Sequence, residues 1–281
     1  MATRPLITPH QRPWTARTVH ILRVLRVVAG AEFKLKYSGS ILGYVWSILK
    51  PLALFAMLLA VFGHLFKLGE ISKYYPVSLL IGIVLFTFFA DATLMGMWSL
   101  VTRESLLRKL SFPRFIIPTS ATLTAAITFG INSVVVCAFI VWNGITPQLT
   151  WVLIFPLVLE LYVFILGISL ILSTLFVRLR DIGQVWELAL QLMFYASPII
   201  YPIGFLPPLL RKLAFFNPFV QVLQDLRYVI LYPDPAPNRI TVANAFGHSA
   251  MRLVPIAIAF GVFAFGLYLF RREEPWFAER V

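Results

Sequence analysis

Three carboxylates inside long apolar stretches are the residues of this sequence that could do chemistry of their own. Asp91, Glu160 and Glu187 each interrupt a run that is otherwise almost free of charge. Because a charged group is costly in hydrocarbon, such a side chain is expected to face protein or water, where it could carry a proton or act as a general base. The three lie on three different predicted helices without a charged neighbour in register, which favours structural pairing over proton coupling.

Motifs for other kinds of catalysis are absent from the sequence. It contains no G-x-x-x-x-G-K-[ST] nucleotide loop, no H-E-x-x-H, no paired-cysteine metal site and no G-x-S-x-G elbow. A membrane glycosyltransferase would need a catalytic carboxylate in an outer loop, where Asp225 and Asp234 have no acidic neighbour. We therefore expect no catalytic residue, metal site or cofactor in this chain, so any ATP and Mg²⁺ would be bound by a partner subunit.

The elements that must position these residues are membrane helices. Of the 281 residues, 59% are hydrophobic and only 13% are charged, against roughly 25% charged residues in soluble domains. A stretch of about 20 apolar residues crosses a hydrocarbon core about 30 Å thick. The sequence predicts an all-α integral membrane protein with six spans, over Trp46–Phe66, Val77–Leu100, Phe115–Trp142, Trp151–Val177, Ile182–Ile203 and Leu253–Phe270.

Basic residues set the expected orientation. The chain has 24 lysines and arginines against 12 acidic residues, and its formal charge is +12. In so apolar a chain this excess favours contact with an anionic membrane surface over nucleic acid. With both termini in the cytoplasm, 17 of the 24 cations lie inside and 7 outside, as the retention of Lys and Arg on the cytoplasmic side requires. We expect a multi-pass protein of the plasma (inner) membrane with both termini cytoplasmic.

A basic amphipathic helix is expected before the first span. From Trp14 onward, apolar residues share one arc of a helical wheel while basic residues cover the other. This pattern is typical of a helix that lies at the membrane surface on anionic lipid. Ser38-Gly39-Ser40 then forms a small-residue turn whose backbone amides could hold phosphate. The region either anchors the chain to lipid or receives a charged substrate.

Two connections have patterns of their own. The outer connection 204–249 contains two apolar sets separated by Asn217-Pro218, which predicts two short helices dipping into the outer leaflet, as an outer gate or as a plain cap. The cytoplasmic connection 102–114 combines basic residues with three leucines, and Thr102 or Ser105 is expected to cap a short helix there. Docked into a groove of a soluble partner, such a helix would bury its leucines and transmit motion.

The segment Ser105–Arg114, S-L-L-R-K-L-S-F-P-R, resembles the coupling segment of permeases that export O-antigens, teichoic acids and capsules. Further similarities follow in the order typical of that family, and they are Leu42-Gly43-Tyr44-Val45-Trp46 with Pro51, Arg178-x-Arg180-Asp181-Ile182, Ser197-Pro198-Ile199-Ile200-Tyr201, Asn217-Pro218 and Arg227. From about Trp14 to Phe270 the chain is therefore similar to the Wzm-like permeases of type-2 ABC exporters.

This resemblance implies a homodimer with two separate Wzt-like ATP-binding subunits, and a lipid-linked polysaccharide as the cargo. The implied ATPase-coupling residues are Arg103, Glu104, Ser105, Leu106, Leu107, Arg108, Lys109, Arg180 and Asp181. A polyprenyl diphosphate would meet cations and backbone amides at Arg17, Arg23, Arg26, Lys34, Lys36, Ser38, Gly39 and Ser40. Because sugars stack on aromatic rings, the candidate glycan channel comprises Trp46, Phe55, Phe62, Phe194, Tyr195 and Tyr201.

The implied organisation has three parts. Residues 1–45 form a cytoplasmic tail and interface helix, 46–271 the six-span domain with the coupling helix 102–114 and the outer gate 204–249, and 272–281 a cytoplasmic tail. Three alternatives share the spans: a small-molecule or lipid ABC exporter, a membrane glycosyltransferase, and a flippase that needs no second subunit. The excess of arginine over lysine is compatible with a high-GC organism such as an actinobacterium, where a lipid-linked galactan is one candidate cargo.

Overall fold

In the computed structural model, every regular element of the described residues is a helix. The structure describes residues 45–103, 113–231 and 240–277, together with residues 25, 29, 30, 33 and 43. The long helices are α2 (Val45–Leu58) continued by the π-helix η2 (Leu59–Leu65), α4 (Tyr75–Thr102), α6 (Ile116–Trp142), α7 (Ile154–Arg178), α8 (Ile182–Ala196) and α12 (Leu253–Glu273). The shorter ones are α3 (Leu68–Ile71), η3 (Leu149–Leu153), η4 (Ile203–Phe205), α9 (Pro208–Ala214), α10 (Pro218–Ile230), α11 (Val242–Phe246), η6 (Ser249–Arg252) and η7 (Glu274–Trp276).

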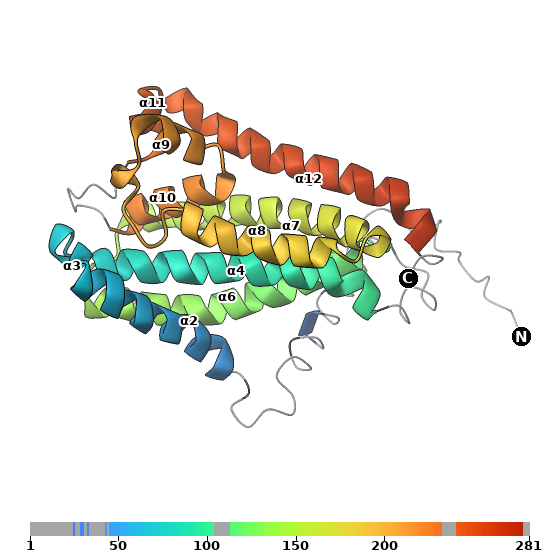
Figure 1. The fold of residues 1–281 in the computed structure, drawn as a ribbon, viewed down its shortest axis with the longest axis horizontal. Helices are drawn as coiled ribbons and strands as arrows, with labels where there is room; N and C mark the ends of the chain where they lie inside the picture. The colour runs from blue at the N-terminus through green and yellow to red at the C-terminus, as the bar shows by residue number, and fades with distance from the viewer. Residues whose placement is uncertain are drawn as a thin grey trace, which may run out of the picture.

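The long helices run lengthwise through the molecule and give it two distinct ends (Figure 1). At one end α9, α10 and α11 gather between α8 and α12; we call this the α10 end. At the opposite end α4 terminates at Thr102 and α12 at Glu273; we call this the Arg103 end, after the residue that follows α4. Consecutive long helices therefore connect alternately at the two ends, which is the arrangement that a multi-pass membrane protein requires.

Five helical stretches among the described residues are long and apolar enough to cross a membrane. They cover 45–65, 75–102, 116–142, 149–178 and 249–276. These stretches correspond closely to five of the six predicted spans, and they support the all-α membrane class.

The remaining predicted span, Ile182–Ile203, is not confirmed, since the helix there is shorter than predicted. Helix α8 has 15 residues and ends at Ala196, because Ser197 has extended backbone angles ahead of Pro198. Its length of about 22 Å is less than the roughly 30 Å of a hydrocarbon core. The chain then passes through a buried turn, Ser197–Ile200, instead of continuing as a helix.

Helix α4 is the centre of the bundle. It is apolar on all sides and has no polar stripe, which is the pattern of a helix buried all round. It packs against α2, α6, α7, α8 and α10. The other spanning helices each leave a broad apolar surface exposed in the single chain.

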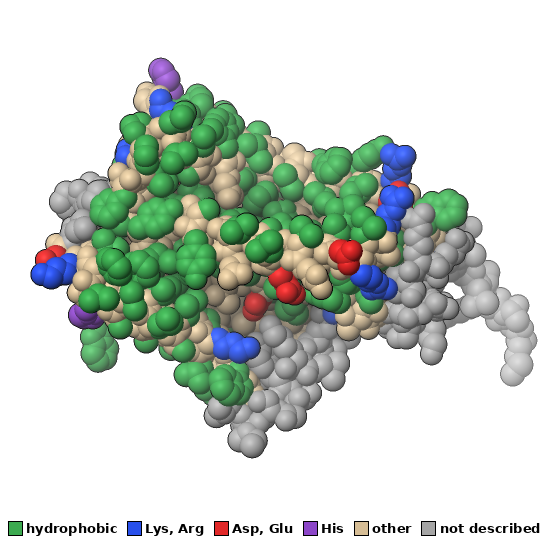
Figure 2. Space-filling model, in the orientation of Figure 1, with side chains coloured by type: hydrophobic (Ala, Val, Ile, Leu, Met, Phe, Trp, Pro, Cys, Tyr) green, Lys and Arg blue, Asp and Glu red, His purple; other side chains and the backbone are tan. Residues whose placement is uncertain are grey.

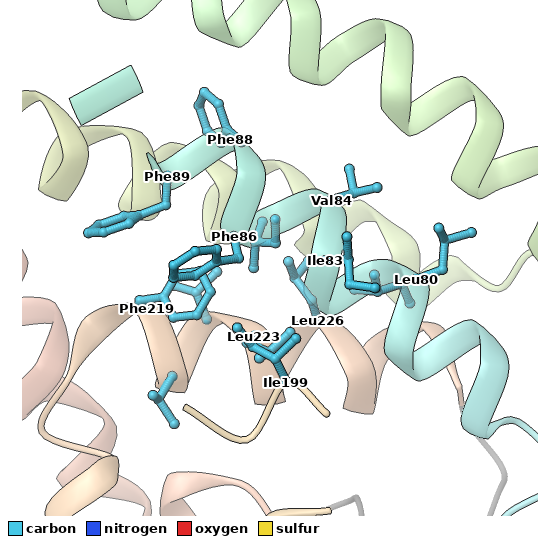
Figure 3. Close-up of a cluster of buried hydrophobic side chains, with 14 of the residues drawn as sticks. Leu80, Ile83, Val84, Phe86, Phe88, Phe89, Ile199, Phe219, Leu223 and Leu226 are labelled. Carbon is cyan, nitrogen blue, oxygen red and sulfur yellow. The ribbon is translucent and has the colours of Figure 1, made fainter. Parts of the chain in front are cut away.

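The outer connection contributes a helix to the core instead of only covering it. Asn217 accepts a hydrogen bond from the Phe219 backbone N at 3.0 Å and Pro218 occupies the first turn, so α10 begins at a well-defined cap. Figure 3 shows Phe219 of α10 beside Phe86 of α4, and the two rings are 5.7 Å apart. The two predicted short helices on either side of Asn217-Pro218 are present as α9 and α10, but nearly all of α10 is buried within the chain instead of dipping into the outer leaflet.

Two predicted regions lie outside the described residues. Nearly all of the N-terminal interface helix and the coupling residues 104–109 belong to them. Thr102, which was expected to cap the coupling helix, is instead the last residue of α4, and its hydroxyl donates to the Trp98 carbonyl at 2.9 Å. The cap prediction for Thr102 is therefore wrong.

Candidate functional site

Arg103 and Arg114, which lie on either side of segment 104–112, both form hydrogen bonds to the bundle. The Arg103 guanidinium donates to the Ser120 hydroxyl at 3.0 Å, in the first turns of α6. On the other side, the Arg114 backbone N donates to the Glu274 carboxylate at 3.1 Å, and the Arg114 guanidinium donates to the Glu274 carbonyl. The two ends of this segment are thus connected to α6 and to the C-terminal end of α12.

The second connection at this end also carries basic residues. The Arg178 guanidinium lies 3.8 Å from the Glu273 carboxylate, and the Arg180 guanidinium lies over the Phe176 ring, 5.3 Å from its centroid. The predicted coupling residues Arg180 and Asp181 are both exposed. Sequence reasoning did not identify Glu273 and Glu274, since acidic residues after the last span have no motif around them.

An exposed apolar face extends over α2 and α8, on either side of α4. Of the predicted channel aromatics, Trp46 on α2 is 43% exposed and Tyr195 on α8 is 61% exposed. Met57 on α2 and Leu192 on α8 are also exposed, and the carboxylate Glu187 is exposed on α8. Figure 2 shows this side of the molecule as largely apolar, with acidic side chains in its middle part. We call it the α2/α8 face.

The other predicted channel aromatics contact residues within the chain. Phe55 packs edge-on against Phe139 with ring centroids 5.4 Å apart, and Phe62 stacks on Phe66 at 5.3 Å. Phe194 packs against Phe86 at 5.0 Å, while the Tyr201 hydroxyl donates to the Ala196 carbonyl at 2.9 Å. The structure does not bring the six rings into one row.

Two further contacts hold α8 against α4. The Trp186 indole N–H donates to the Thr93 hydroxyl at 3.1 Å. The Phe86 and Phe194 rings then continue the contact toward the α10 end.

Of the predicted span carboxylates, Asp91 is half-buried on α4.

At the α10 end, Arg227 joins three parts of the chain. It is 2% exposed, and its guanidinium donates to the carbonyl oxygens of Pro198 at 2.6 Å, Ile199 at 2.9 Å and Ser78 at 3.0 Å. The Tyr75 hydroxyl donates to the Ile200 carbonyl at 2.8 Å. Three of these carbonyls belong to the non-helical turn after α8, where the backbone groups have no helical partners, and the fourth belongs to the first turn of α4.

Burial lowers the pKa of Arg227 to about 9, while the neighbouring Tyr75 phenol acts in the opposite direction. The guanidinium therefore remains protonated at neutral pH. The sequence matched Ser197–Tyr201 and Arg227 as separate motifs, and the structure brings them together in one site, which we call the Arg227 cluster.

Glu160 and Asp225 are neighbours, contrary to the expectation that neither has a charged group nearby. Glu160 on α7 faces Gln221 and Asp225 on α10, and Arg252 approaches the Asp225 carboxylate. The sequence could not show this, because the proximity arises from α10 folding back onto α7.

The described fold is that of a multi-pass membrane protein, with the contacts of Arg103 and Arg114 at one end and the buried Arg227 cluster at the other. The family model for ABC-2 type transporters matches residues 23–231, so the chain belongs to the ABC-2 type transporter family. The resemblance to Wzm-like permeases of type-2 ABC exporters, drawn from the motifs, is thereby confirmed.

Curated relatives agree with this family. The chain is 31% identical over 209 residues to an O-antigen export system permease protein of Klebsiella pneumoniae, covering 74% of this chain and 80% of the relative. It is 26% identical to the O-antigen export system permease protein of Myxococcus xanthus, over 89% of this chain and 92% of the relative. A polysialic acid transport protein of Escherichia coli is 25% identical over 86% of this chain and 90% of its own length.

Proposed function

We propose that this chain is the permease subunit of an exporter that carries a polyprenyl-diphosphate-linked polysaccharide across the plasma membrane. The polysaccharide class is supported by relatives whose names refer to O-antigen export and polysialic acid transport. The chain is not an enzyme by itself in this proposal, because ATP and Mg²⁺ are bound by a separate ATP-binding subunit.

The α2/α8 face is the observation that carries the proposal. An ionisable residue such as Glu187 is costly against lipid and belongs beside protein or water. We therefore infer that this face borders a second copy of the chain and a water-filled path between the copies. Exposed rings such as Trp46 and Tyr195 would offer stacking surfaces to a passing glycan.

Coupling would take place at the Arg103 end. Two ATP-binding subunits, one for each permease copy, would contact residues 104–109 together with Arg180 and Asp181. The attachment of Arg103 to α6 and of Arg114 to Glu274 supports this, since a force on the intervening segment would pass directly to α4, α6 and α12.

The remaining parts complete the proposed architecture. Residues 1–45 would lie on anionic lipid and receive the diphosphate through the cations predicted above. Helix α8 with the turn after it would make the sixth crossing, so that both termini are cytoplasmic. Residues 46–271 would then form the transmembrane domain, with 204–249 at the outer gate and 272–281 as a cytoplasmic tail.

The test replaces Leu106→Asp together with Leu107→Asp in the full chain, expressed with its ATP-binding subunit. Two charges in an apolar docking groove should weaken docking at least about 100-fold. Co-purification of the ATP-binding subunit and ATP-dependent transfer of lipid-linked glycan into reconstituted vesicles should both be lost.

A matched control carries Leu209→Asp with Leu213→Asp, two exposed leucines of α9 that lie outside the five spanning stretches. It should retain the ATP-binding subunit. If the Leu106/Leu107 variant keeps the partner, the docking surface is wrong. If the unaltered complex moves no lipid-linked glycan when ATP is supplied, the proposed substrate is wrong.

A further inference from the structure

A cleft of about 600 Å³ lies between α7, α10 and α12 at the α10 end, around the Glu160 and Asp225 pair. Its walls are mainly apolar and include Leu157, Val229 and Ile256. A polar cluster of Glu160, Gln221 and Asp225 lines the same cleft. The volume is within the range of cavities that bind small ligands or headgroups.

The polar cluster has hydrogen-bond acceptors without donors. The Gln221 amide donates to one oxygen of Asp225 at 2.7 Å. However, Oε1 of Gln221, Oε1 of Glu160 and Oδ1 of Asp225 are buried and lack a hydrogen-bond partner. Gln221 is 1% exposed and Glu160 8% exposed, so bulk water does not readily satisfy these oxygens. Unpaired buried acceptors are unfavourable, and they indicate a site that a donor-bearing ligand would complete.

The charges in the cleft indicate which donor fits. Two carboxylates and the single guanidinium of Arg252 leave a net negative charge when both acids are ionised. Burial raises the pKa of Asp225, while the hydrogen bond from Gln221 and the charge of Arg252 lower it. A primary ammonium brings one positive charge and three N–H donors, one for each unpaired acceptor. A neutral sugar would supply donors but would leave the charge uncompensated.

Features around the cleft point to a lipid as the source of the ammonium. Leu153, which lines the cleft, is exposed, and the helices that form its walls expose further apolar side chains, including Leu159 on α7 and Leu253 on α12. Arg252 places a cation next to the acidic cluster. A headgroup in which a phosphate is joined to an ammonium would need such a cation for its phosphate. Groups of three or more His, Cys, Asp or Glu side chains that could hold a metal ion do not occur in the described part of the chain.

We propose that this cleft binds the ethanolamine headgroup of a phospholipid, with the ammonium on Glu160, Gln221 and Asp225 and the phosphate on Arg252. The acyl chains would lie along the exposed apolar faces of α7 and α12. This site does not depend on the proposed export function, because binding can be measured on the resting chain without a partner or glycan.

The experiment compares two phospholipids that have the same acyl chains but carry either ethanolamine or choline. The full-length chain is purified in detergent, delipidated and titrated with each lipid, and bound lipid is measured by native mass spectrometry. Choline has the same charge but no N–H donor, so the ethanolamine lipid should bind at least about tenfold more tightly. Glu160→Gln and Asp225→Asn should each reduce this preference about tenfold, whereas Glu187→Gln, on the α2/α8 face, should leave it unchanged.

Equal binding of the two lipids by the unaltered chain would overturn the proposal, and that comparison does not depend on the folding of any variant. A preference that survives both Glu160→Gln and Asp225→Asn would locate the lipid elsewhere and would also overturn it. The same titration with glucosamine tests an amino sugar as the source of the ammonium. If glucosamine binds the delipidated chain while the ethanolamine lipid does not, the ammonium belongs to an amino sugar and the lipid assignment is wrong.

Discussion

Arg227 illustrates how one buried charge can organise a membrane protein. Its guanidinium is planar and has several N–H donors in fixed directions, so it can reach the carbonyls of Pro198, Ile199 and Ser78 together. These carbonyls belong to the turn after α8 and to the first turns of α4. A single side chain of α10 thereby fixes the non-helical backbone that separates α8 from the outer helices.

The charge of Arg227 is less important to this role than its shape. Arg227→Lys keeps the charge but cannot donate to all three carbonyls at once, so we expect a loss of stability of about 3 kcal/mol. The measurement is the apparent melting temperature of the purified chain in detergent. Arg272→Lys, at an exposed position on α12, is the control and should not change it. An unchanged melting temperature for Arg227→Lys would mean that the turn is held by other contacts.

At the scale of elements, α7 and α12 approach each other closely at two glycines. A Cβ carbon at Gly167 would lie 2.6 Å from the Phe263 Cα, and one at Gly266 would contact the Gly167 backbone. Small residues allow helix backbones to approach in this way inside a membrane, where packing and not apolar burial drives association. The Gly167–Gly266 contact therefore sets the distance between two of the spans that line the acidic cleft.

We expect Gly266→Leu to separate α7 from α12 and to cost about 3 kcal/mol, because a side chain cannot be accommodated between the two backbones. Gly261→Leu is the matched control, since no atom lies within 4 Å of a Cβ at Gly261 on the same helix. Thermal unfolding and the yield of monodisperse protein in detergent should distinguish the two variants. Equal behaviour of both would show that the pair tolerates a wider spacing.

At the scale of the whole molecule, the central position of α4 leaves two apolar faces on the single chain. The α2/α8 face carries Glu187, whereas α12 exposes Phe260, Phe265 and Tyr268. Lipid readily covers an apolar face without charge, but a carboxylate favours protein or water. This asymmetry predicts that the chains associate through the α2/α8 face.

Cross-linking in the membrane tests this prediction. The sequence has a single cysteine, Cys137, so Cys137→Ser provides a background in which new cysteines can be compared. Tyr195→Cys in this background should form a disulfide-linked dimer on oxidation. Tyr268→Cys, on α12 and similarly exposed at 60%, should remain monomeric. Cross-linking of Tyr268→Cys alone would instead assign the interface to α12.

The sequence by itself determined the all-helical membrane class, the approximate bounds of five long spans and the family. These follow from local properties. A run of apolar residues forms a helix in a membrane, and each motif consists of residues that lie close together in the sequence. The sequence also indicated the Asn217-Pro218 break, because capping depends on neighbouring residues. It overestimated the length of the helix in Ile182–Ile203, because the apolar run continues past Pro198 whereas the helix ends at Ala196.

Only the tertiary structure decided which distant residues meet. Glu160 and Asp225 have no acidic neighbour along the chain, and they become neighbours because α10 packs against α7. Arg227 meets Pro198 and Ser78 for the same reason. Contacts of this kind depend on how helices of nearly uniform apolarity pack, and uniform apolarity gives the sequence no periodic signal from which a facing side could be predicted.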